Sequence, residues 1–109
     1  MIVALSNMIH LSSSPEMLKE LLNKYDNVII QVDKLDNDYT RTCKLEELIV
    51  VEPSSPIISA ARKYVIGIDG RLLYCKVKQK RNKSVIYILG IGEVKISDIT
   101  IWCNAKKLN

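Results

Sequence analysis

Asp69 is the acidic residue whose position in the sequence most favours chemistry. It follows residues 65–68, a short apolar run that predicts a buried strand. The carboxyl ends of such strands are where open α/β sheets gather ligands and reactive groups. Gly70 comes next, so the same aspartate also suits a tight turn or the cap of a helix. A catalytic role for Asp69 therefore requires partner groups from elsewhere in the chain.

A strongly basic segment follows Asp69. No acid occurs between Gly70 and Gly92, and the net charge of the whole chain is +4. The cations of this segment are Arg71, Lys76, Lys78, Lys80, Arg81 and Lys83. Clustered cations bind nucleic acids because they neutralise phosphates and release counterions. The segment predicts an RNA-binding surface, and the alternative is a solvated basic face without a ligand.

The cysteines and the histidine lack the spacing of a metal site. Cys43, Cys75 and Cys103 are far apart in the sequence and form no CxxC pair. Their odd number also argues against a disulfide framework. We expect them to be small apolar residues of the interior, and we expect His10 to lie at the surface.

Length and composition restrict the class of protein. A chain of 109 residues corresponds to one domain, residues 1–109, with its own core. Hydrophobic residues make up 48% of the chain and charged residues 26%, as in soluble globular proteins. No apolar stretch reaches the roughly 18 residues needed to span a bilayer, and the start, MIVALSN, lacks the basic region of a signal peptide. These features predict a cytoplasmic protein without a membrane partner.

Strand and helix signals alternate along the first half of the chain. Three apolar runs are predicted to be buried strands: residues 1–5, 28–32 and 48–51. Ser14 followed by Pro15, and the similar motif before residue 57, predict two helices: residues 15–24 and 56–63. The polar segments are predicted to be loops: residues 7–14 and residues 33–47, the latter with one or two short helices. Repeated strand–helix units favour an α/β fold with a mainly parallel sheet.

Residues 71–80 fit two different structures. Leu73, Cys75 and Val77 alternate with the residues between them, and the preceding Asp69–Gly70 pair suits a two-residue turn, so the local pattern favours a β-hairpin. The alternative is a helix capped by Asp69. Residues 93–102 also alternate and predict one or two short edge strands in the C-terminal part of the chain.

The order of these elements resembles a PIN domain. AARKYVIGIDGRLLYCKVKQKRNKSVIYILG follows that family's second half: an amphipathic helix ending in a Lys-Tyr-like pair, a strand, an Asp-containing motif that opens a basic helix, and a last parallel strand. MIVALSN and LLNKYDNVIIQVDKLDND fit the opening half. The likeness is to the small archaeal PIN proteins of the rRNA-processing endonuclease branch. It implies a PIN-like three-layer α/β sandwich, with a helix in place of the hairpin over residues 71–80, and we adopt that interpretation.

The resemblance also implies a reduced metal site. PIN nucleases hold Mg²⁺ or Mn²⁺ on several carboxylates that converge at one edge of the sheet. Asp69 matches one of these acids, and Asp36 and Asp38 flank Asn37, which takes the place of another. Leu5 replaces the first aspartate, and leucine has no oxygen ligand. The resemblance therefore implies no cofactor, or Mg or Mn bound by Asp36, Asp38 and Asp69 if the protein cuts RNA.

Three functions are consistent with this sequence. The preferred one is a non-catalytic RNA-binding PIN-like protein in rRNA processing or a ribonucleoprotein, with Tyr39, Tyr64 and Tyr74 as candidate stacking residues. The second is an interaction subunit that forms homo- or hetero-oligomers through an edge at residues 96–102. The third is a metal-dependent endoribonuclease in which Asp69 is catalytic and acts with the acids between residues 33 and 38.

Overall fold

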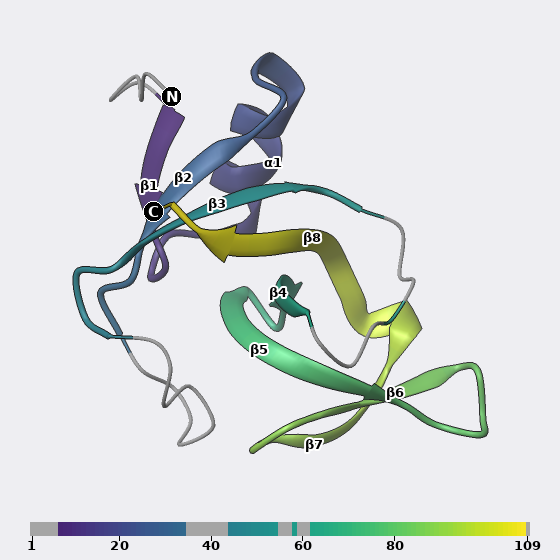
Figure 1. The fold of residues 1–109 in the computed structure, drawn as a ribbon. Helices are drawn as coiled ribbons and strands as arrows, with labels where there is room; N and C mark the ends of the chain where they lie inside the picture. The colour runs from purple at the N-terminus through teal and green to yellow at the C-terminus, as the bar shows by residue number, and fades with distance from the viewer. Residues whose placement is uncertain (1–6, 35–43, 55–57, 59–61, 109) are drawn as a thin grey trace.

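The fold is mostly β. The computed structural model describes residues 7–34, 44–54, 58 and 62–108, which contain eight strands, the α-helix α1 and the short 3₁₀-helix η2 (Figure 1). In chain order these are β1 (Met8–His10), α1 (Pro15–Lys24), β2 (Val28–Gln31), β3 (Leu48–Pro53), β4 (Lys63–Ile68), β5 (Arg71–Gln79), β6 (Val85–Ile88), β7 (Gly92–Lys95), η2 (Ile96–Asp98) and β8 (Ile99–Lys107). No helix in this part of the chain is long and apolar enough to cross a membrane.

The strands form one mixed sheet in the order β1-β2-β3-β8-β4-β5-β6-β7. Among the strands of the described residues, only β1 and β2 are parallel, and all other neighbours are antiparallel. The expected PIN-like three-layer α/β sandwich with a mainly parallel sheet is therefore wrong. The central residues of β2 and β3 are buried on both faces, which is typical of parallel strands. Antiparallel strands produce the same apolar runs when both of their faces are covered.

Helix α1 matches its predicted bounds. The Ser14 hydroxyl oxygen accepts a hydrogen bond from the backbone N–H of Met17 at 3.3 Å, and Pro15 is the first helical residue. The helix buries Leu18 completely against the sheet. Strand β1 lies within residues 7–14, which were predicted to be a loop; it has only three residues and is paired along one side, with β2.

A tight hairpin joins β4 to β5. Asp69 and Gly70 have φ angles of 51° and 72°, and Ile68 pairs with Arg71 across them. Two successive positive φ angles are typical of a type I′ turn, whose twist matches that of the flanking strands. Residues 71–79 are therefore a strand, and the helix inferred from the PIN resemblance is wrong. The local alternation and the Asp-Gly turn predicted this segment correctly.

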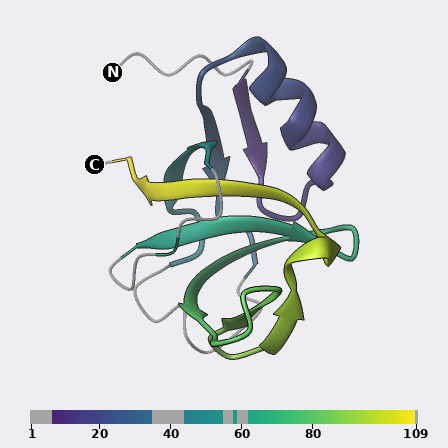
Figure 2. The same ribbon diagram turned by 90° about the vertical axis from the view of Figure 1, so that its right-hand side faces the viewer.

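Strand β5 connects the two parts of the sheet. Its residues 71–76 pair with β4 and its residues 77–79 pair with β6, beyond which β7 forms the edge. Figures 1 and 2 show α1 with β1 and β2 at one end of the molecule and the curled β5–β7 strands at the other. The strands thereby separate two apolar clusters.

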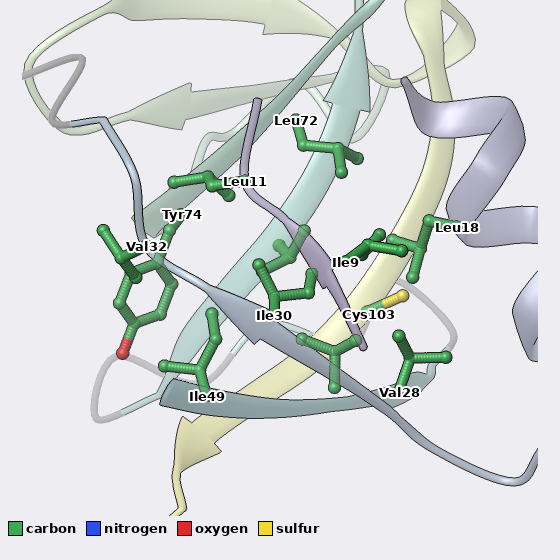
Figure 3. Close-up of a cluster of buried hydrophobic side chains, with 12 residues drawn as sticks. Ile9, Leu11, Leu18, Val28, Ile30, Val32, Ile49, Leu72, Tyr74 and Cys103 are labelled. Atoms are coloured by element: carbon green, nitrogen blue, oxygen red, sulfur yellow. The ribbon is translucent and has the colours of Figure 1, made fainter. Parts of the chain in front are cut away.

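We call the first cluster the helix-side core, because Leu18 of α1 packs in it with Ile30, Tyr74 and Cys103 (Figure 3). Val65 of β4 belongs to the same cluster. The second, the inner core, contains Tyr64, Ile66, Leu73 and Trp102 among its buried residues. Since successive side chains of a strand point to opposite faces, β4 and β5 contribute to both cores.

Strand β8 lies in the middle of the sheet. Its residues 99–105 pair with β4, and its residues 103–107 also pair with β3 on the other side. Residues 96–98 form η2, and residues 99–102 pair along one side with β4, so an interaction edge at residues 96–102 stays a prediction. The prediction of C-terminal edge strands is correct only for β7. The predicted strand over residues 1–5 and most of the predicted helix over residues 56–63 lie outside the described residues, and Lys63 already belongs to β4.

Gly67 in β4 leaves no room for a larger residue. A Cβ atom there would lie 2.5 Å from Ile101 Cγ2 and 2.9 Å from Thr100 Oγ1. We expect Gly67→Ala to lower the free energy of unfolding by about 1–3 kcal/mol, because it overpacks a close strand–strand contact. Urea denaturation measures this loss. Ile101→Ala removes the nearest methyl group, so the double variant should lose less than the sum of the single variants. Strictly additive losses would exclude crowding against Ile101 as the cause.

Candidate nucleic-acid interface

Three lysines form a row on the helix-side face of β4 and β5. Lys76 and Lys78 follow Tyr74 at every second position of β5, so they share its face, and both are exposed. Lys76 pairs directly with Lys63 of β4. Neighbouring strands lie about 4.8 Å apart, so these side chains are close enough to contact adjacent phosphates of one ligand. We call Lys63, Lys76 and Lys78 the lysine row.

An exposed tyrosine continues this face on β6. Tyr87 pairs with Lys78 on one side and with Glu93 of β7 on the other, and 36% of its surface is exposed. The ammonium Nζ of Lys80 lies 5.8 Å from the centre of the Tyr87 ring and 3.1 Å from Glu93 Oε1. Because Glu93 balances the charge of Lys80, we expect Lys80 to contribute less to phosphate binding than the lysine row.

The structure separates the other predicted cations from this row. Arg71 begins β5 at the hairpin with β4, whereas Arg81 and Lys83 lie in the connection between β5 and β6, and all three are exposed. The whole nine-residue length of β5 lies between Arg71 and Arg81. The six cations predicted as one surface therefore occupy opposite ends of a strand as well as its face.

Two of the three predicted stacking tyrosines are buried. Tyr64 is 0% exposed and Tyr74 is 4% exposed, so neither ring can stack on a base, and Tyr39 lies outside the described residues. Tyr87 was missed. The available signal was the alternation in Val85-Ile86-Tyr87-Ile88, which places Tyr87 opposite the buried isoleucines.

A basic cavity of about 520 Å³ adjoins the lysine row. Its lining includes Lys63 of the row together with Arg62, Lys106 and Lys107, and Glu52 is the acid among its described lining residues. The Lys107 ammonium is paired with Glu47 at 3.1 Å, and Lys63 Nζ lies 5.2 Å from the centre of the Tyr74 ring. The cavity extends the positive surface from β5 across the ends of β4 and β8.

The acids proposed for metal binding do not come together in the described residues. Asp69 is exposed in the β4–β5 turn, and Asp36 and Asp38 lie outside the described residues. No group of three or more His, Cys, Asp or Glu side chains suited to a metal occurs in the part of the chain that the structure describes. β2 and β4 run in opposite directions. Asp33 follows β2 and Asp69 follows β4, so the two acids lie beyond opposite ends of the strands.

Asp33 is engaged by the loop after β1. Desolvation raises the pKa of this carboxyl group, but hydrogen bonds from the Ser12 hydroxyl and from the Ser12 backbone N–H, the latter at 2.9 Å, lower it below its ordinary value. The charged Asp33 carboxylate therefore stabilises the loop that contains Ser12.

Two cysteines lie in the interior and the histidine at the surface, as predicted. Cys75 and Cys103 are unpaired and buried, and desolvation raises the pKa of each thiol to about 12. Both remain protonated at neutral pH and are poor nucleophiles. His10 is exposed, and Cys43 lies outside the described residues.

Comparisons with known proteins add no family to this description. No protein-family model matches the sequence, and no curated protein or solved structure is similar enough to count as a match.

Proposed function

We propose that the protein binds RNA through the lysine row without cutting it. The supporting observation is the register of β4 and β5, which sets Lys63 beside Lys76 and places Lys78 two residues further along the same face. Neither strand contains an acid. A polyanion can therefore approach this face without meeting a like charge from β4 or β5.

The chemistry of the row suits phosphate groups. Ammonium groups on adjacent strands neutralise successive phosphates and release condensed counterions, which gives affinity that does not depend on sequence. The basic cavity beside Lys63 extends this attraction. We propose no cleavage at the lysine row, because a hydrolytic metal ion needs several carboxylates and the row supplies only ammonium groups.

Charge reversal of the row tests this proposal. If a single RNA strand contacts the three lysines, the logarithm of its affinity should fall with the logarithm of salt concentration with a slope of about −2, or about 20-fold between about 50 and 200 mM salt. Lys76→Glu/Lys78→Glu should weaken binding at low salt by at least about tenfold and flatten this slope. Fluorescence anisotropy with a labelled RNA measures both quantities.

A matched control separates the row from the net charge. Lys19 on α1 and Lys44 before β3 are both exposed, and Lys19→Glu/Lys44→Glu changes the net charge by the same amount. This variant should keep the wild-type slope and most of the affinity. Equal losses in the two double variants would contradict binding at the row, and binding that is insensitive to salt would contradict the electrostatic mechanism.

A further inference from the structure

We infer that Tyr87 is a base-stacking residue and that the RNA bound by this face is single-stranded. This inference rests on the proposed function and adds the class of RNA and the residue that selects it.

Tyr87 differs from the tyrosines of β4 and β5 in that its side chain is exposed. Tyr64 and Tyr74 are almost fully enclosed, whereas Tyr87 projects from the centre strand of the β5–β6–β7 ribbon with 36% of its surface accessible. Ile91, in the turn between β6 and β7, is also exposed, at 42%. An exposed aromatic ring on a positive face is typical of surfaces that bind unpaired bases.

Two charged side chains lie near the Tyr87 ring. Lys80 lies over the ring at 5.8 Å from its centre and is itself held by Glu93 at 3.1 Å. Glu93 is the cross-strand partner of Tyr87, and Lys80 is the residue that follows β5, so two charged side chains lie beside the ring. A tyrosine side chain has two rotatable χ angles, so it loses little conformational entropy when a base stacks on it.

The position of Tyr87 relative to the lysine row fits one strand of RNA. Lys78 is the direct partner of Tyr87 across the β5–β6 pair, and Lys76 and Lys63 continue from it toward β4. A strand whose base stacks on Tyr87 can therefore place its phosphates on the row. A duplex offers phosphates to the lysines, but its base faces are stacked within the helix and are closed to Tyr87.

The experiment compares three probes with two substitutions of Tyr87. The probes are a short oligouridylate, a ribose-phosphate chain of the same length without bases, and a blunt RNA duplex. Tyr87→Ala should weaken oligouridylate binding about 5- to 150-fold, which corresponds to the usual stacking contribution of about 1–3 kcal/mol per base. Binding of the other two probes should not change. Tyr87→Phe keeps the ring and should bind oligouridylate as the wild type does.

The controls distinguish a failed inference from a failed function. Ile91→Ala removes the exposed apolar side chain of the β6–β7 turn and should leave the preference for base-containing RNA intact. Equal losses for all three probes in Tyr87→Ala, or wild-type binding that favours the duplex, would overturn the stacking role while the effect of Lys76→Glu/Lys78→Glu still supports RNA binding. If that charge reversal also has no effect, the proposed function itself is wrong.

Discussion

Removal of residues 93–109 is expected to abolish cooperative folding. The deletion removes β8, which forms antiparallel ladders with β3 and with β4 and is the strand through which these two are joined. It also removes Trp102 from the inner core and Cys103 from the helix-side core. The stabilisation lost with two ladders and parts of both cores should exceed the free energy of unfolding of an ordinary domain, which is about 5–15 kcal/mol. Circular dichroism during thermal unfolding should show no transition.

A pair of proline substitutions tests the same point without shortening the chain. Cys103 lies in the central strand, and proline there removes a backbone donor from a ladder that has partners on both sides. Lys95 lies on the edge strand β7, and since the backbone N–H of Ile96 bonds to Ser84, the N–H of Lys95 points away from β6. Cys103→Pro should unfold the protein, and Lys95→Pro should be tolerated. A truncated chain with an unchanged transition would mean that β8 is a dispensable tail.

Leu18→Ala is expected to destabilise the protein by about 3–5 kcal/mol, whereas Met17→Ala on the same helix should change stability by less than about 0.5 kcal/mol. Leu18 is 0% exposed and packs into the helix-side core, while its neighbour Met17 is 47% exposed. The cavity left by the leucine side chain is bounded by strands on one side and by the helix backbone on the other, so it can collapse only partly.

The corresponding measurement is the midpoint of thermal unfolding. A loss of this size lowers the midpoint of a domain of about 100 residues by more than about 12 °C. Both substitutions introduce alanine into the same turn of α1, so helix propensity affects them almost equally. Similar midpoints for the two variants would show that α1 does not anchor the helix-side core.

The sequence supported correct predictions wherever a local signal decided the structure. Ser14 and Pro15 fixed the start of α1, and the Asp69–Gly70 pair fixed the hairpin, because capping and type I′ turns depend on a few adjacent residues. The sheet topology could not be predicted in this way. Apolar runs reveal burial, but they do not reveal strand direction, and an element order resembling the PIN family led to a helix at residues 71–80 that local alternation contradicted.

The candidate site was predicted in part. Composition identified the basic segment, and alternation along β5 would have placed Lys76 and Lys78 on one face. Lys63 joins them only through the β4–β5 register, and Tyr87 only through the β5–β6 register, so neither could be assigned before the strands were paired. The turn explains why an aspartate stands at position 69: its φ angle is positive, and aspartate tolerates this better than most residues.

The central place of β8 sets the order in which a nascent chain can complete its fold. A ribosome adds residues at about 5–20 per second and delivers β8 after both strands that it joins. Until then, β3 and β4 each present an unpaired edge, and their apolar residues remain accessible to other chains. Newly made copies are therefore most prone to aggregate just before this strand leaves the exit tunnel, and chaperone binding would protect them most in that interval.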